Sequence, residues 1–402
     1  MRLVGALAAT AALAAPAAAQ DINDLNVDFF QGPINSSGRV IGLGGAYTGI
    51  AEGADGHLSN PASYATRYVY EADDTWAWDF AFSGLDDAGR NRQTFDLSGR
   101  GVYDSANFGQ LGIDAKYKEY GFGIHSFGQI YTMTVDNEDG SQTTFEYDQN
   151  FVSLGFAHNF SQGELVLGAS LLGGLATIAE LNVVGKPIGA LEMQGGGLQF
   201  GALWARPDKN YRLGASFRTP IIMTQQESDT FTGELVTEFG KLRVPNSVII
   251  PLELSLGASA LFGPRQYNIT PTFGRPLPEG QDPPLRLLER RYLLVSADVI
   301  LTGPADAAIG VQDFLAQQVQ QSGRTASIGL RAGVESEFWE DLMQARAGAY
   351  FEPSRFDATP GRLHLTGGLD YHFTLYWEWK IGLTFDLARR YSNVGLGLGF
   401  WH

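Results

Sequence analysis

Cysteine is absent from the 402 residues of this sequence. A disulfide scaffold, a thiolate metal site and a cysteine nucleophile are therefore excluded. Basic residues are few, since 28 Lys and Arg stand against 44 Asp and Glu, which gives a formal net charge of −16. This sign argues against nucleic-acid binding, because a protein that binds nucleic acid presents a basic surface.

Long apolar runs are missing too, except at the N-terminus. Arg2, the apolar residues 3–15 and the three alanines 17–19 follow the order of a secretory signal peptide that is cleaved before Gln20. We therefore predict that residues 1–19 are a signal peptide. After this leader no apolar run reaches the roughly 20 residues that a membrane helix needs, so a membrane-spanning form of this chain must cross with strands.

Apolar and polar residues alternate from about residue 68 to the C-terminus. In one segment Trp76, Trp78 and Phe82 fall on one face of a strand, while Asp79 and Ser83 fall on the other. The polar faces carry many glycines and charges of both signs, as a wet and crowded lumen would. The segments also approach the length that a tilted strand needs to cross a bilayer. These features favour a membrane barrel over a soluble sandwich.

The alternating segments number about 14, and an even number suits a bacterial barrel with both ends in the periplasm. We predict an all-β, transmembrane antiparallel barrel over residues 67–402, with a short helix at 304–321 in one of its loops. The predicted strands are 68–83, 108–119, 121–135, 144–160, 164–180, 194–206, 211–225, 244–262, 285–302, 324–338, 342–353, 362–373, 375–387 and 391–402.

The stretch 38–65 differs from the rest of the chain. It is rich in glycine and alanine, ends in the turn Asn60-Pro61-Ala62, and keeps neither the period of a strand nor that of a helix for long. Glycines allow backbone to pack closely against backbone. We therefore predict that residues 20–66 form a plug (hatch) inside the barrel lumen.

These residues resemble a known family. The run from Gly38-Arg39 to Gly44-Gly45-Ala46, followed by Asn60-Pro61-Ala62, is similar to the N-terminal hatch of FadL-type outer-membrane transporters for long-chain fatty acids and other hydrophobic compounds. Three barrel stretches, 211–220, 244–247 and 345–353, also look like that family. The resemblance covers most of the mature chain.

The resemblance implies a lateral exit. In the family, a hydrophobic ligand is held in the lumen and released sideways beside a kinked third strand, against which the Asn-Pro-Ala turn lies. Here the third segment loses its alternation at Ser126, Phe127 and Gly128, and glycine within a strand often marks a bulge. We therefore expect a kink at these residues, held open by Asn60, Pro61 and Ala62. An ordinary strand with small outward residues is the alternative.

Candidate ligand contacts come from the plug and from inward arginines. We expect the pocket to be lined by apolar plug residues, namely Phe29, Phe30, Ile41, Leu43 and Tyr47. Guanidinium groups match carboxylate geometry and could hold a fatty-acid headgroup; the candidates are Arg212, Arg218, Arg331 and Arg346. Structural ion pairing is the preferred reading for these arginines, because inward acids lie in neighbouring segments, namely Asp298, Glu335, Glu352 and Asp370.

The sequence predicts a passive channel for hydrophobic small molecules in the outer membrane of a Gram-negative bacterium. We expect no cofactor, no metal and no enzymatic activity, because no catalytic or metal-binding spacing is found. We expect a monomer whose partners are its ligand, membrane lipid and the barrel-insertion machinery. The main alternative is a non-transporting barrel similar to PorV-type proteins, which would use the proline-rich connection 263–284 to dock a secretion or surface partner. A barrel hydrolase is disfavoured, since no Ser/His/Asp set can be assembled.

Overall fold

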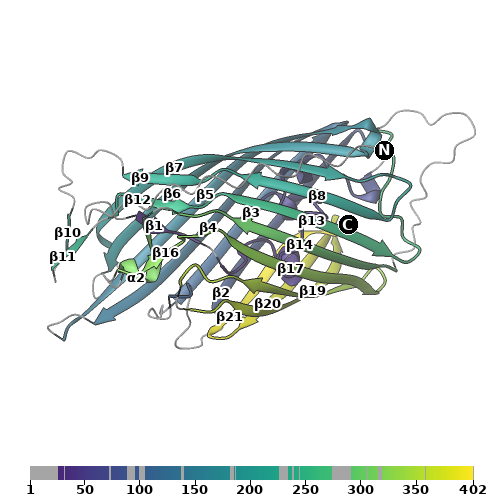
Figure 1. Ribbon diagram of the computed structural model, residues 1–402. Coiled ribbons are helices and arrows are strands. Elements are labelled where there is room, and N and C mark those ends of the chain that lie inside the picture. Colours follow the sequence, from purple (N-terminus) through teal and green to yellow (C-terminus); the bar gives the residue numbers. More distant parts are fainter. Residues whose placement is uncertain are drawn as a thin grey trace, which may run out of the picture.

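In the computed structural model, the chain forms a closed antiparallel β-barrel around its own N-terminal segment (Figure 1). The structure describes residues 26–30, 32–71, 74–87, 96–98, 105–136, 140–181, 185, 187–225, 234–237, 240–243, 245–273, 291–305, 307–315, 319–357 and 359–401. No helix among these residues is both long enough and apolar enough to cross a membrane.

The wall has 14 strand positions, and its last strand pairs with its first to close it. The predicted antiparallel barrel is therefore confirmed. In chain order the wall strands are β2 (Trp76–Asp87), β3 (Ser105–Tyr117), β4 (Tyr120–Asp136), β5 (Gln142–Phe160), β6 (Leu165–Leu181), β7 (Pro187–Trp204), β8 (Tyr211–Arg218) continued by β9 (Ile221–Gln225), β12 (Ser247–Ile250) continued by β13 (Glu253–Phe262), β14 (Leu293–Thr302), β17 (Ser327–Trp339), β18 (Met343–Glu352), β19 (Arg362–Leu375), β20 (Trp377–Ala388) and β21 (Tyr391–Phe400).

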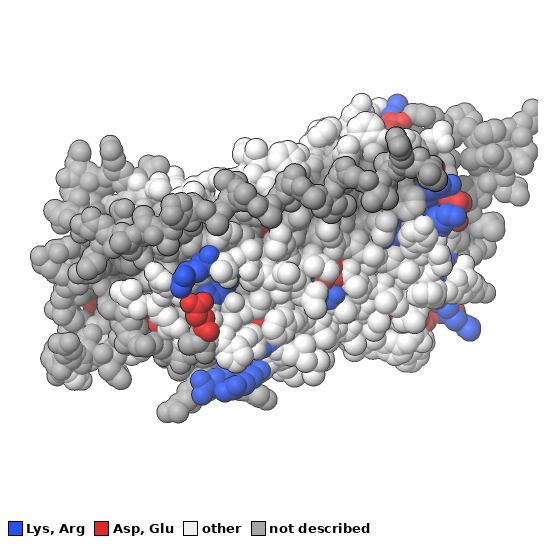
Figure 2. Space-filling view, viewed as in Figure 1, with Lys and Arg blue, Asp and Glu red and all other residues white. Residues whose placement is uncertain are grey.

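The alternation of residue types decides which side chains face outward. On β14 every second residue is exposed, beginning with Leu293 and including Val295 and Val299, while Ser296 and Asp298 between them are buried in the lumen. Figure 2 shows that the described part of one outer face is mostly uncharged, with charged side chains gathered toward the ends of the barrel. Such an outward apolar band is what a barrel exposes to lipid.

Two wall strands are interrupted where the sequence predicts continuous segments. Proline lacks a backbone N–H and cannot donate to a ladder. Ile221 pairs with Ile250 and Arg218 pairs with Glu253, so Pro220 and Pro251 fall opposite each other between these pairs. The predicted start at residue 68 is also wrong: β2 begins at Trp76, because Tyr68 is buried near the end of the N-terminal segment.

The N-terminal segment, residues 26–71 as far as described, occupies the lumen and is called the plug below. It contains β1 (Asn26–Asp28), α1 (Gly38–Gly42) and three single-turn helices, η1 (Ala54–Gly56), η2 (Pro61–Tyr64) and η3 (Val69–Glu71). Most of its residues are buried. β1 runs parallel between β12 and β15 (Ala308–Gly310), where it joins the sheet (Figure 1).

The barrel has a short-turn end and a long-loop end. At the short-turn end, β3–β4, β5–β6, β17–β18 and β19–β20 are joined by tight turns, one of which contains η4 (Ser161–Gly163). The long-loop end carries the small hairpin of β10 (Glu234–Thr237) and β11 (Gly240–Arg243), together with β15, α2 (Val311–Leu315) and β16 (Gln321–Ser322). The predicted helix 304–321 is therefore too long, since strand residues flank a single helical turn.

The long connection after β13 lies at the short-turn end, as the strand count predicts. Part of it falls outside the described residues, but its beginning folds into the lumen, where Tyr267 and Phe273 are buried. The ring of Tyr267 covers the guanidinium of Arg212 at 3.9 Å. This part of the connection therefore helps to close the short-turn end.

Candidate functional site

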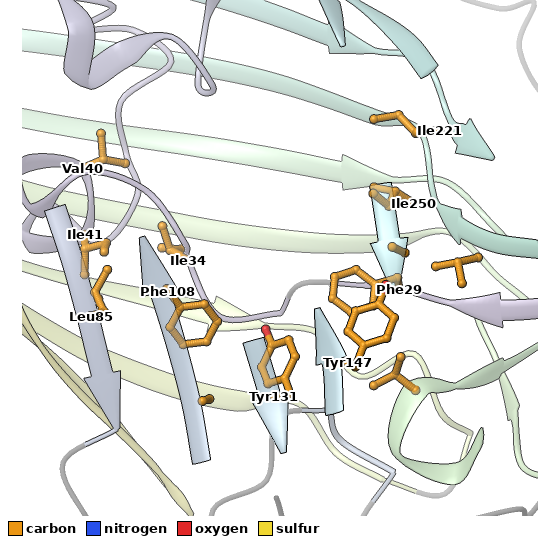
Figure 3. Close-up of a cluster of buried hydrophobic side chains, with 14 of the residues drawn as sticks. Phe29, Ile34, Val40, Ile41, Leu85, Phe108, Tyr131, Tyr147, Ile221 and Ile250 are labelled. Carbon is orange, nitrogen blue, oxygen red and sulfur yellow. The ribbon is translucent and has the colours of Figure 1, made fainter. Parts of the chain in front are cut away.

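A cavity lies inside the barrel, between the first residues of the plug and the wall. Its volume is about 140 Å³. Its apolar lining includes Phe29, Phe30, Ile34 and Val40 of the plug, and Phe127, Phe151, Leu172, Ile221, Ile250 and Ile300 of the wall. Phe29 stacks on Tyr147 of β5, with ring centroids 5.1 Å apart (Figure 3). The plug and the wall therefore build the cavity together, and we call it the lumen cavity.

Polar side chains line the rest of the lumen cavity. They include Asn35, Thr48, Gln199, Arg218, Glu253, Ser255, Arg331, Tyr350 and Glu352. Asn35 donates from its amide to Gln129 (3.1 Å), and its own carbonyl oxygen has no hydrogen-bond partner among the described residues. The site thus suits a ligand with an apolar body and a polar group.

The turn Asn60-Pro61-Ala62 docks against the wall on a patch of glycines. The Asn60 amide donates to the carbonyl of Thr48 (2.9 Å) and to that of Ala202 on β7 (3.0 Å), and its oxygen accepts from Ala62 N (3.0 Å). The wall glycines that face η2 come from four adjacent strands, and they are Gly121, Gly123, Gly155, Gly168 and Gly201. A Cβ at Gly168 or Gly201 would run into the turn, and one at Gly121, Gly123 or Gly155 would run into Tyr64 at the end of η2. The absence of side chains therefore permits the close approach.

The predicted kink in the third strand is not present. β4 pairs with β3 and with β5 in constant register through residues 126–128, so no gap opens in the wall beside it. Ser126 and Gly128 face outward, whereas Phe127 faces inward and lines the lumen cavity. Small outward residues leave the backbone ladder intact, and the inward glycines instead accommodate the plug.

A network of buried charges ties the plug to the wall between the lumen cavity and the short-turn end. Glu335 accepts hydrogen bonds from Arg39 of the plug (2.8 Å) and from Arg346 of β18 (2.6 Å). Arg346 also reaches Asp370 on β19 (2.7 Å). Arg346 is therefore committed to structural pairing and does not line the lumen cavity, contrary to the ligand role considered for it.

A second arm of this network joins Glu52 of the plug to two arginines. Glu52 binds Arg212 of β8 (2.7 Å) and Arg39 (3.1 Å). Burial alone would raise the pKa of Glu52, but the guanidiniums of Arg212 and Arg39 outweigh it and hold this pKa below the ordinary value. Arg212 is thus also a structural residue that holds the plug.

Acid is expected to loosen the plug through Glu52. A carboxyl whose pKa is lowered by folding contributes stability above its ordinary pKa, and this contribution is lost as the pH falls through the folded value. We expect hydrogen exchange of residues 38–71, corrected for intrinsic rates, to show lower protection at pH 3 than at pH 7. In Glu52→Gln the plug should already be less protected at pH 7 and respond less to acid. An unchanged pH response in that variant would contradict the assignment.

The other predicted site residues separate into two groups. Phe29, Phe30, Arg218 and Arg331 lie at the lumen cavity. Ile41, Leu43 and Tyr47 are fully buried elsewhere in the plug, where Tyr47 donates to the backbone carbonyl of Glu52 (3.1 Å), and they do not line the cavity. The sequence did not point to Phe151, Ile221 or Asn35. Alternation in its segment places Phe151 inward, but the alternation of residues 211–217, continued to residue 221, places Ile221 outward, and the break at Pro220 reverses it.

No metal cluster is found among the described residues, where no group of three or more His, Asp or Glu side chains is placed to hold an ion. Two of the buried histidines, His57 and His364, form hydrogen bonds within the barrel. His57 of the plug contacts Asp114 of β3 (3.1 Å) and stacks on Tyr64. These contacts add to the attachment of η2 to the wall.

Comparisons with known proteins identify the fold. No family model matches the chain, and no curated protein matches it by sequence. The structure is similar to that of a Pseudomonas aeruginosa FadL homologue, with a TM-score of 0.55 and 13% identity, over 91% of this chain and 98% of that one. It is similar to the Pseudomonas putida toluene transporter TodX (TM-score 0.55, 14% identity, 91% and 98% covered). It is also similar to the Ralstonia pickettii toluene transporter TbuX (TM-score 0.55, 14% identity, 92% and 98% covered). The chain therefore has the FadL-type fold that the sequence predicted.

Proposed function

We propose that this protein is a channel for the passive uptake of small hydrophobic molecules across an outer membrane. The observation that carries the proposal is the lumen cavity, which is walled by aromatic and aliphatic side chains of both the plug and the barrel. Pockets that combine apolar walls with placed polar groups are typical ligand sites. The shared fold with two toluene transporters supports the same function class.

The orientation follows from the strand count. The wall begins and ends at the short-turn end, which in bacterial barrels faces the periplasm, while long loops face outward. The outward apolar band and the predicted signal peptide support placement in the outer membrane of a Gram-negative bacterium. With this orientation, the lumen cavity and β1 lie toward the outside, and the charge network around Glu335 lies toward the periplasm.

The cavity volume favours compact ligands. An apolar protein cavity of about 150 Å³ holds one benzene molecule, and the lumen cavity has about 140 Å³. A long acyl chain is several times larger than benzene. We therefore propose ligands the size of a single ring, and a long-chain fatty acid fits this site less well.

Passage is proposed to run along the plug. The wall beside β4 is unbroken, so release at that place is not part of the proposal. Below the lumen cavity the route is filled by the plug and its charge network. Movement of the plug would therefore open the way to the periplasm, driven by the concentration gradient of the ligand.

The second candidate function is that of a non-transporting barrel that docks a secretion or surface partner. It is favoured by the unbroken wall and by the charged, filled periplasmic half of the lumen. Ligand binding separates the two functions, because a docking barrel does not require a ligand in its cavity.

Filling the cavity is expected to abolish binding. Ile221→Trp places a larger ring where a buried side chain lines the cavity, and should weaken toluene binding by about 10-fold or more, which is roughly 1.4 kcal/mol. Ile222→Trp is the matched control, since the neighbouring side chain faces outward and is 52% exposed. Binding is measured by calorimetry on the purified full chain in detergent, and uptake in liposomes. Equal toluene binding in the two variants, or a wild type that binds no single-ring compound at all, would contradict the proposed function.

A further inference from the structure

Four inward arginines of the wall were candidates for ligand binding, and the structure divides these four by their partners. Arg212 and Arg346 are saturated by carboxylates of the plug and the wall. Arg218 and Arg331 instead line the lumen cavity. Only these last two can meet a ligand.

Arg331 has no carboxylate partner at salt-bridge distance among the described residues. Its guanidinium donates to the carbonyl of Gly45 in the plug, at 3.4 Å. Asp298 lies directly opposite it on β14, but one oxygen of that carboxylate accepts the N–H groups of Tyr47 (3.0 Å) and Thr48 (2.9 Å). Arg331 is therefore a cation at the cavity with one long hydrogen bond to a neutral group.

The charge of Arg218 is only partly balanced by a nearby carboxylate. Its nearest carboxylate is Glu253, at 3.6 Å, and its buried Nε has no hydrogen-bond partner among the described residues. The remaining acid at the cavity, Glu352, is already engaged by Arg362 and His364 (2.9 Å). Among the described residues, Arg331 is thus the arginine at the cavity that no carboxylate reaches at salt-bridge distance, and Asp298 acts on it only from across the ladder.

We propose that the ligand of the lumen cavity is a compact carboxylate, a single aromatic or alicyclic ring bearing one acid group, and that Arg331 binds this group. The inference rests on the proposed function and names its substrate class. The ring would fill the apolar part of the cavity near Phe29 and Ile221. The carboxylate would receive the parallel N–H donors of a guanidinium, which match its geometry.

Binding at Arg331 would also affect the plug. The carboxylate would compete with the carbonyl of Gly45 for the same guanidinium. Gly45 lies in a turn with φ of +74°, next to Gly44 with φ of +61°. Ligand binding would therefore release one of the bonds that hold this turn of the plug against β17.

The test compares benzoate with toluene on the purified full chain at neutral pH. A charge-assisted hydrogen-bonded pair is worth enough to favour benzoate by about 10-fold to 100-fold. In Arg331→Met the ratio of benzoate to toluene affinity should fall by about 10-fold or more, and Arg331→Lys should give an intermediate ratio because it keeps the charge but loses the paired donors. Arg206→Met is the control, since Arg206 is an exposed residue paired with Asp208 at the short-turn end and should leave the ratio unchanged.

The outcomes separate this inference from the proposed function. A wild-type protein that binds toluene as tightly as benzoate overturns the inference and leaves the proposed function standing. The inference also fails if the ratio is unchanged in Arg331→Met, or if both affinities fall equally, which would indicate a structural role. Thermal unfolding of each variant shows whether it is folded. If neither compound binds the wild type, the proposed function fails as well.

Discussion

Replacing Glu335 by glutamine is expected to release the plug while the wall stays folded. Glu335 is fully buried and accepts hydrogen bonds from Arg39, Arg346 and the hydroxyl of Tyr292 (2.9 Å). Removing its charge leaves two guanidiniums of the lumen without their shared counter-ion. Loss of one partner of a buried ion pair costs about 3–5 kcal/mol, and here most of that loss falls on the contact between plug and wall.

The measurement distinguishes plug from wall. Limited proteolysis with mass spectrometry should reveal cuts within residues 38–71 of the variant, while the barrel keeps its resistance to unfolding by detergent. Single-channel conductance should rise if the plug leaves the lumen. Glu340→Gln is the matched control, because Glu340 belongs to an exposed ion pair with Arg291, whose expected contribution is below about 1 kcal/mol. A plug that stays fully protected in Glu335→Gln would refute this view of the network.

Substitution of Gly168 by valine is expected to have a similarly large effect. A Cβ at this position of β6 would overlap the backbone carbonyl of Pro61, which cannot move aside as a flexible side chain can. Overpacking typically costs about 1–3 kcal/mol and occasionally more, and we expect the upper end or beyond. The turn Asn60-Pro61-Ala62 should be displaced from the wall, with loss of ligand binding.

Gly173→Val tests whether the strand itself tolerates valine. Gly173 lies on the same strand, faces outward, and the nearest atom to a Cβ there is 4.0 Å away. Valine favours strands, so this control should fold at least as well as the wild type. Refolding yield and thermal unfolding of both variants are compared. Equal behaviour of the two would show that the glycine patch does not hold the plug.

Strand identity was readable from the sequence because the outward and inward faces differ so strongly in chemistry. The interruptions at Pro220 and Pro251 were visible as residues, yet the alternation on both sides of them masked the breaks. The kink at Ser126–Gly128 was inferred from weak alternation, but a small outward residue changes hydrophobicity without changing backbone pairing. A pattern of residue types therefore does not separate a real break in a strand from a regular strand with a few small outward residues.

Contacts that depend on register could not be predicted. Glu352, His364 and Asp386 come from three adjacent strands, and register alone places His364 between the two carboxylates, at 2.9 Å and 2.8 Å. In the same way, inward parity identified Arg346 and Arg331 as equivalent candidates. Their partners differ because Glu335 and Asp370 are adjacent to Arg346 across the ladder. Arg331 faces Asp298, one oxygen of which accepts from the plug, and the two side chains do not reach salt-bridge distance.

The position of β1 has a consequence for the order of folding. Asn26 pairs beside Ser247 and beside Ala308, which are 221 and 282 residues later in the chain (247 − 26 and 308 − 26). The earliest strand of the described chain therefore has no neighbours until most of the wall has been made. Closing so large a loop is slow and entropically costly. Because β1 needs both β12 and β15 in place, we expect its seating to be a late step that completes the molecule.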